Sequence, residues 1–246
     1  MTSNPNAPAG QATGHGPERS LLRAWWAALI LSAILFSLYP QVDLAVSSTF
    51  HTEAGFRIAQ SPAYARARSA MEHLYYAAAL GSLVGFLLSL WRGTILRSPR
   101  RIWGTLTAVW LLGPGLIVNG ILKEYWGRAR PAHLAEFGGT AEFTPALLPA
   151  DQCARNCSFV SGEAAGAAAF GVTLWLLSAP IGSAPLRFAL RGVAVAIVIV
   201  GALLRVIAGR HFLSDVIFAV IIVTGLALVL LHLTGRPKKE TADAAG

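Results

Sequence analysis

Charged residues are scarce in this sequence. Asp, Glu, Lys and Arg make up 13% of its 246 residues, about half the share that is usual in a soluble globular domain. Hydrophobic residues make up 54% of the chain, and its mean hydropathy is +0.55. The apolar residues come in long runs, without the alternation of a half-buried strand or the heptads of a coiled coil. This pattern excludes an ordinary soluble domain and indicates an integral membrane protein.

Cysteine is also scarce, with only Cys153 and Cys157, which lie four residues apart in the longest polar loop. Two thiols without paired histidines nearby fall short of a zinc set, so we predict no metal site. In an outward-facing loop, two cysteines can form a disulfide. A separation of four within a regular helix suits that bond poorly, so the disulfide requires a turn. The sequence leaves both the disulfide and the free thiols open.

The apolar runs predict six membrane-spanning helices, each near the ~20 residues that a bilayer requires. We therefore predict an all-α polytopic membrane protein, built as a six-transmembrane-helix bundle over residues 19–235. A disordered cytoplasmic tail would precede it at 1–18, and a short cytoplasmic tail would follow at 236–246. The predicted spans are Leu21–Tyr39, His73–Leu90, Ile102–Leu122, Ala164–Ala179, Phe188–Leu204 and Val216–Leu233.

The basic residues outnumber the acidic ones by 20 to 12, but their placement argues against a nucleic-acid partner. Eleven of the 20 lie on the tails and short loops that face the cytoplasm if both termini are inside, as the positive-inside rule predicts. Six of the other nine cluster in two outer loops. These six weaken the orientation signal, and an anionic ligand at the outer face would explain them.

The polar segment Leu204–Asp215, between the last two apolar runs, contains two arginines, a histidine and an aspartate. His211 and Asp215 are four residues apart, so they share one helix face if the last helix has begun by His211. An aspartate bound to one imidazole nitrogen fixes the tautomer and raises the basicity of the other nitrogen. That arrangement suits a nucleophile or a general base. An interfacial loop with solvated charges explains this segment alone equally well.

Two more segments have the composition of an anion site. If the third helix runs on past Leu122, Lys123 and Arg130 lie seven residues apart on one stripe, before Pro131 ends the helix. Basic residues that merely flank a membrane helix are the alternative. Further on, Ser161 is a natural helix N-cap, and the free backbone N–H groups around Ser161 and Gly162 would bind phosphate. Capping alone also explains this second segment.

Taken together, the three segments resemble the type-2 phosphatidic acid phosphatase family, which shares its helical core with the vanadium haloperoxidases. The first motif of that family is Lys, six residues, then Arg-Pro, and Lys123, Arg130 and Pro131 match it. The second motif is Pro-Ser-Gly-His, of which Ser161 and Gly162 keep the central pair. The resemblance covers roughly residues 102–233.

The third family motif is Ser-Arg, five residues, His, three residues, Asp. Arg205, His211 and Asp215 match it in full spacing, and Leu204 replaces the serine. The resemblance implies that His211 attacks phosphorus to form a phosphohistidine, while Asp215 orients its ring. Water then releases phosphate, with no metal or other cofactor. The phosphate-binding residues that the resemblance implies are Lys123, Arg130, Ser161, Gly162 and Arg205.

Glu163 is the main departure, because the family has a histidine there that protonates the leaving oxygen. A glutamate can replace it as the catalytic acid only if it holds a proton. Alternatively, Glu163 binds a cation or amine of the substrate, and another group such as His133 supplies the proton. In a third interpretation, catalysis has been lost and the site only binds.

The sequence therefore predicts an integral membrane phosphatase whose active site faces outward. Its partners would be the bilayer and a phosphorylated lipid, such as lipid A, undecaprenyl pyrophosphate or phosphatidylglycerol phosphate. The Cys-Ser-Phe-Val-Ser-Gly-Glu loop is similar to that of some lipid A phosphatase-like members. The family implies a bacterial inner membrane, with the site toward the periplasm. A transporter or anion-binding membrane protein is the alternative, but the near absence of charge within the helices disfavours it.

Overall fold

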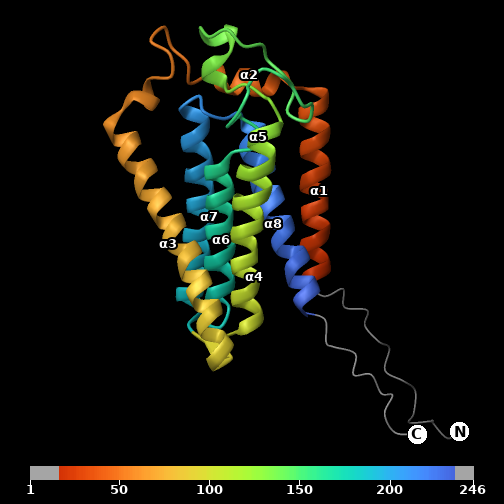
Figure 1. The fold of residues 1–246 in the computed structure, drawn as a ribbon, viewed down its shortest axis with the longest axis vertical. Helices are drawn as coiled ribbons and strands as arrows, with labels where there is room; N and C mark the ends of the chain where they lie inside the picture. Colours follow the sequence, from red (N-terminus) through yellow and green to blue (C-terminus); the bar gives the residue numbers. More distant parts are fainter. Residues whose placement is uncertain (1–16, 236–246) are drawn as a thin grey trace, which may run out of the picture.

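The protein is a bundle of long helices that run side by side (Figure 1). The computed structural model describes residues 17–235. In that range six long helical segments follow the predicted order, and the all-α membrane fold is confirmed. They are α1 (Pro17–Leu38), α3 (Pro62–Arg92), the segment of α4 (Arg100–Trp110), η2 (Leu111–Leu122) and α5 (Lys123–Tyr125), then α6 (Gly162–Ser178), α7 (Ala184–Ile207) and α8 (Leu213–Gly235).

Five of the six segments are long and apolar enough to cross a membrane, within the described part of the chain. The sixth, α6, has 17 residues and lies against α3, α4, α7 and α8. Its small side chains allow this central position, because they let neighbouring backbones approach closely. At Gly166, for example, an added Cβ would come within 2.9 Å of the Tyr75 ring. The core of the bundle is therefore built around a short, alanine-rich helix.

The second and third helices differ most from the predicted spans, while the bounds of the others differ by up to four residues. The second begins at Pro62 rather than His73, because the Ser61 hydroxyl accepts from the Ala63 N–H and Pro62 suits a first helical position. The third changes from α to π geometry over Leu111–Leu122, a segment that contains Pro114. Proline has no N–H to donate, which interrupts regular α-helical bonding.

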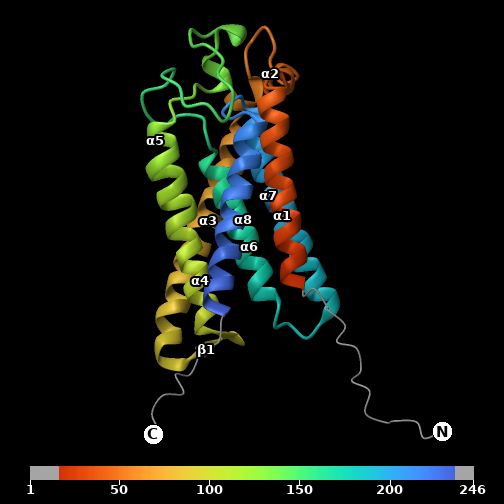
Figure 2. The same cartoon turned by 90° about the vertical axis from the view of Figure 1, so that its right-hand side faces the viewer.

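The irregular segments gather mainly at one end of the bundle, which we call the loop end (Figures 1 and 2). There lie the short helix α2 (Gln41–Ser48), the 3-10 turns η1 (Arg57–Gln60), η3 (Pro131–His133) and η4 (Ala135–Phe137), and the long loop before α6. The opposite end has the short hairpin of β1 (Thr94–Ile95) and β2 (Ser98–Pro99). The predicted tails lie outside the described residues, except that α1 begins at Pro17.

Candidate active site

The three sequence motifs meet at the loop end, around a cavity of about 400 Å³. Its walls come from α3, the η2–α5 segment, the start of α6, and the α7–α8 connection. Of the predicted site residues, Ser161 and Asp215 lie behind the wall, fully buried. The other six line the cavity: Lys123, Arg130, Gly162, Glu163, Arg205 and His211.

The backbone between Lys123 and Arg130 differs from the predicted helix. The helix ends at Tyr125, so the expected helical stripe between them is wrong. Gly127 turns the chain with φ of 72°, and an added Cβ there would lie 1.6 Å from the Ala150 carbonyl oxygen. This turn requires glycine, and it brings Arg130 back toward Lys123 as part of a loop.

The cavity contains cationic donors without partners. Among the described residues, the Lys123 ammonium makes no hydrogen bond or ion pair, and the buried Arg205 Nε has no hydrogen-bond partner. Arg130 uses one donor, with its Nη2 2.8 Å from the Asn156 carbonyl oxygen. Burial, followed by Arg205 and Arg210, lowers the pKa of Arg130. Buried donors are normally paired in folded proteins, so this cluster is built to receive an anion.

His211 is held by a main-chain carbonyl rather than by the predicted aspartate. Its Nδ1 lies 2.7 Å from the Ser158 carbonyl oxygen and 3.7 Å from Asp215 Oδ2. A carbonyl can only accept, so Nδ1 carries the proton and Nε2 is left with its lone pair. The prediction that Asp215 binds an imidazole nitrogen directly is therefore wrong. The last helix, α8, begins at Leu213, so His211 precedes the helix instead of sharing a helix face with Asp215. Burial lowers the pKa of His211 to about 4, despite the nearby Asp215.

Asp215 instead lies in a buried network of its own. Its Oδ1 accepts from Arg128 Nη1 at 2.6 Å. Its Oδ2 accepts from the Ser158 hydroxyl at 2.5 Å and from the Phe212 N–H at 2.9 Å. Asp215 thus fixes Ser158, whose carbonyl fixes His211, and it orients the imidazole through this intermediate.

Arg128 and Asp43 belong to the same network, and the sequence analysis missed both. Arg128 is fully buried, and its Nη2 lies 2.8 Å from Asp43 Oδ2. Asp43 comes from α2, and it also accepts from the Ser214 N–H at 2.9 Å. The spacing Arg-x-Arg-Pro could have drawn attention to Arg128. No local pattern could have linked Asp43 to a segment 171 residues later.

Glu163 faces the cavity from the first turn of α6, paired with two arginines. Its Oε1 lies 2.8 Å from Arg68 Nε and 3.2 Å from Arg205 Nη1. Oε2 makes no hydrogen bond within the described range. Arg68, which the sequence analysis missed, also bonds Glu72 at 2.6 Å. His133, the alternative proton donor, lies in η3 and is not part of the cavity wall.

The start of α6 closes the cavity on another side. The Ser161 hydroxyl accepts from the Ala164 N–H at 3.3 Å, so this side chain caps the helix. At Gly162, an added Cβ would lie 2.6 Å from Asn119 Oδ1. Gly162 therefore packs closely against Asn119, which also lines the cavity. The N-terminal end of α6, with its positive partial charge, faces the same space as the cations.

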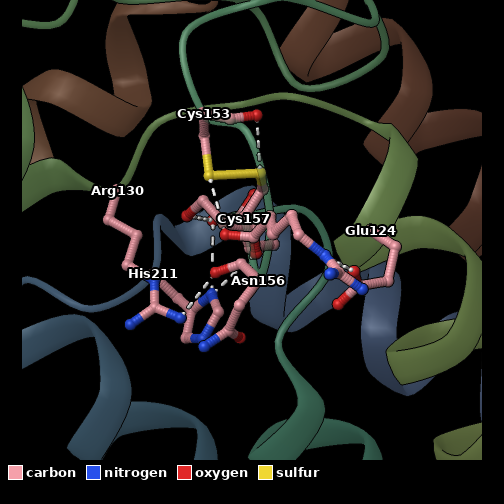
Figure 3. Close-up of a disulfide and its surroundings, with 9 residues drawn as sticks. Glu124, Arg130, Cys153, Asn156, Cys157 and His211 are labelled. Carbon is pink, nitrogen blue, oxygen red and sulfur yellow. Dashed lines mark hydrogen bonds and ion pairs between the residues drawn. A yellow bond between two sulfur atoms is a disulfide. The ribbon is translucent and has the colours of Figure 1, made fainter.

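Cys153 and Cys157 form a disulfide, so the open question about the thiols is resolved. Figure 3 shows Arg130, Asn156 and His211 lying together beside this disulfide. In the described part of the chain, no group of three His, Cys, Asp or Glu side chains could hold a metal ion.

Comparison with known proteins identifies the family of this chain. The chain is 34% identical over 213 residues to a lipid A 4'-phosphatase of Rhizobium leguminosarum, covering 78% of this chain and 85% of that protein. It is 36% identical over 130 residues to a lipid A 4'-phosphatase of Francisella tularensis subsp. novicida, covering 52% and 56%. No solved structure matches. Residues 103–239 match the PAP2 superfamily, and they contain all three motifs; the chain belongs to that superfamily.

Proposed function

We propose that this protein removes a phosphate group from a lipid A-type substrate through a phosphohistidine on His211. The family and the relatives make the chain a membrane lipid phosphatase, which is a hydrolase. The head group, the covalent intermediate and the independence from metal ions are the proposal. The relatives named lipid A 4'-phosphatase support that head group.

One observation supports the mechanism above all: a neutral imidazole faces a cavity with unpaired cationic donors. Nδ1–H of His211 is held by the Ser158 carbonyl, which leaves Nε2 free to attack. Lys123, Arg130 and Arg205 line the same cavity and would neutralise the phosphate oxygens. A nucleophile and an anion site in one pocket are the elements that phosphoryl transfer requires.

The reaction would proceed in two steps. His211 Nε2 attacks phosphorus, the N–P bond forms, and the bond from phosphorus to the lipid oxygen breaks. The Ser158 carbonyl, 2.7 Å from Nδ1, and Asp215, 3.7 Å away, stabilise the positive charge on the ring. A water molecule then attacks phosphorus and gives a proton to the Glu163 carboxylate that the first step left unprotonated, the N–P bond breaks, and inorganic phosphate leaves. The cations around the cavity stabilise the charge in both steps.

Glu163 is proposed as the group that protonates the leaving lipid oxygen. Its Oε1 forms ion pairs with Arg68 and Arg205. The acid role therefore requires that the substrate phosphate take over these two arginines, so that the carboxylate can hold a proton. Its Oε2, which has no hydrogen-bond partner in the part of the chain described, is the atom that would hold the proton. The binding of a substrate amine by Glu163 is the competing role.

The shape of the cavity supports a lipid substrate. Beyond the cations, its wall continues along the membrane helices with Tyr75, Tyr76, Ala79, Trp110 and Gly115. An apolar wall next to an anion site fits a molecule with a charged head and a hydrophobic body. For localisation, we propose a bacterial inner membrane with the cavity facing the periplasm and both termini in the cytoplasm. The disulfide beside the cavity supports an oxidising compartment.

The proposal is tested by phosphate release from lipid A, undecaprenyl pyrophosphate and phosphatidylglycerol phosphate. The purified full chain in detergent is compared with His211→Ala, each with and without a chelator. We expect chelator-resistant release from lipid A and a loss of roughly 10³-fold or more in kcat for His211→Ala. Rapid quenching should trap phosphate on the wild-type protein but not on the variant. Full activity in His211→Ala would refute the nucleophile.

The role of Glu163 is tested by Glu163→Gln, which keeps the shape but removes the acid. We expect kcat/KM to fall by about 10²- to 10⁴-fold with the lipid substrate. A p-nitrophenyl phosphate substrate, whose leaving group needs no proton, should lose much less. An equal loss for both substrates would assign Glu163 to binding, and an unchanged rate would exclude the acid role. Binding of phosphate without turnover in the wild type would mean that catalysis has been lost.

A further inference from the structure

The segment Cys153–Ser158 touches both halves of the catalytic apparatus. Its first five residues are closed into a small ring by the Cys153–Cys157 disulfide, which we call the disulfide ring. Ser158 follows the ring directly. On one side the segment contacts the loop with Lys123 and Arg130, and on the other it contacts the connection that contains His211. It therefore joins the phosphate-binding side of the cavity to the nucleophile.

The ring fixes a phosphate-binding cation through Asn156. The Asn156 carbonyl oxygen accepts from Arg130 Nη2 at 2.8 Å, the one hydrogen bond that the Arg130 side chain makes within residues 17–235. Asn156 has φ of 52°, a left-handed conformation that asparagine tolerates better than most residues. Its side chain also lines the cavity. The position of Arg130 thus depends on a main-chain carbonyl in a tight turn.

Ser158 fixes the nucleophile from the other end of the segment. Its carbonyl oxygen lies 2.7 Å from His211 Nδ1, and its hydroxyl donates to Asp215 at 2.5 Å. Its N–H donates to the Arg128 carbonyl at 2.8 Å, and the Cys157 N–H donates to the Lys123 carbonyl at 2.8 Å. A single short segment therefore sets the tautomer of the imidazole and the place of both flanking motifs.

Little besides the disulfide restrains the ring on its outer side. The one ion pair of a ring side chain in the described structure joins Arg155 to Glu124 at 2.8 Å, and the Arg155 side chain is 83% exposed. An exposed pair of this kind contributes little. Once the disulfide is opened, residues 153–157 regain backbone freedom, and the Asn156 carbonyl that holds Arg130 loses its fixed place. Ser158 keeps its own bonds to the Arg128 carbonyl and to Asp215, so His211 is affected only through the covalent link from the ring to Ser158.

We propose that the disulfide ring is a positioning element of the phosphatase, in which Asn156 positions Arg130, and that Ser158, directly after the ring, positions His211. This inference rests on the proposed function of His211 and Arg130. The consequence is that the oxidised protein is the efficient catalyst. Misplacement of a reacting group by about 1 Å can cost about 10²-fold in rate, so opening the ring should weaken phosphate binding and slow turnover together.

The test compares the full chain in detergent before and after treatment with dithiothreitol. The disulfide accepts two electrons and two protons from the added dithiol and becomes two thiols, while the dithiol becomes a cyclic disulfide. The chain has two cysteines, so this bond is the only target of the reductant, and the Cys153 side is partly exposed. We expect kcat/KM for the lipid and the affinity for inorganic phosphate each to fall about 10-fold or more, and reoxidation to restore both.

Two variants separate positioning from a general loss of structure. Cys153→Ser/Cys157→Ser should match the reduced wild type and should not respond to dithiothreitol. Arg155→Gln, in the same ring, removes the exposed ion pair and should stay within about twofold of the wild type. Thermal unfolding of each sample shows that the bundle is intact. A reduced protein that keeps full kcat/KM and full phosphate affinity would overturn the inference.

The two proposals fail in different ways. If the oxidised wild type releases no phosphate from any lipid, the proposed function fails. The affinity for inorganic phosphate then remains as the test of whether the disulfide ring positions Arg130. A lower affinity after reduction would still support the positioning of Arg130, and an unchanged affinity would refute it. If the wild type is active, unchanged kinetics after reduction refute the ring and leave the function standing.

Discussion

Arg128 and Arg130 lie two residues apart, yet the structure gives them opposite environments. Arg128 is completely buried, and all three of its guanidinium nitrogens are bonded. They donate to the Thr144 carbonyl at 2.9 Å, to Asp215 at 2.6 Å and to Asp43 at 2.8 Å. Arg130 donates one hydrogen bond, to the Asn156 carbonyl, and lines the cavity.

The difference between these two arginines separates framework from binding site. Two carboxylates flank Arg128, so its charge is neutralised by the protein itself. Arg130 forms no ion pair with a carboxylate in the described part of the chain, although Glu163 lines the same cavity as the cations Lys123 and Arg205. A cation that the protein leaves uncompensated is available to a ligand. The same residue type thus neutralises buried carboxylates in one place and, in our proposal, binds phosphate in the other.

The largest effect is expected when the framework arginine is removed. Arg128→Met would leave Asp43 and Asp215 buried without their cation, which should cost about 3–5 kcal/mol of unfolding free energy. Arg130→Met, the matched control, should cost about 1 kcal/mol or less. Denaturant titrations in detergent micelles measure both values. Equal destabilisation by the two substitutions would break the distinction between the two arginines.

The second prediction concerns Arg130, whose substitution should reduce activity without reducing the stability of the fold. Arg130→Gln keeps a donor but removes the charge that stabilises the transition state. We expect kcat/KM to fall by about 10²- to 10³-fold, as for other transition-state donors, while the unfolding midpoint stays near that of the wild type. Steady-state phosphate release and thermal unfolding of the same preparation test this. Wild-type activity in Arg130→Gln would show that Arg130 does not bind the phosphate group of the substrate.

The smallest effect concerns the protonation of His211. Burial lowers the pKa of His211 from 6.5 to about 4, so the imidazole stays neutral when an exposed histidine would already be charged. We expect the ring signal of His211, in protein with isotope-labelled histidine, to stay constant as the pH falls from about 8 to about 5. His211→Ala assigns the signal. A titration midpoint of His211 near 6.5 would contradict this prediction, because it would show that water reaches the imidazole.

Local sequence patterns predicted the parts of the site that depend on short-range order. The apolar runs predicted the order of the six long helices, and five of them are long and apolar enough to cross a membrane in the described part of the chain, because a span requires a continuous run of about 20 residues whatever its neighbours are. Residues of the first and third motifs line one cavity, namely Lys123, Arg130, Arg205 and His211, and their roles there stay predictions. The helical stripe from Lys123 to Arg130 was wrong, because Gly127 turns the chain within it.

Contacts between distant segments were beyond prediction. Asp43 and Arg68 reach the site from before the matched region, across sequence separations of 85 residues to Arg128 and 95 to Glu163. Neither has a periodic pattern or a motif that would mark it. The partner of His211 Nδ1 is a main-chain carbonyl, and every residue has one, so side-chain chemistry could not identify it.

The sequence by itself determined that this chain is an all-α membrane protein and predicted which residues form a phosphate site, because hydropathy and motif spacing are local properties. Only the tertiary structure decided which charges are neutralised. Arg128 and Arg130 look alike in the sequence, and only the packing of α2 and α8 supplies Asp43 and Asp215 to one of them. The physical reason is that the free energy of a buried charge depends on the partners within a few ångströms, and folding brings those partners from distant parts of the chain.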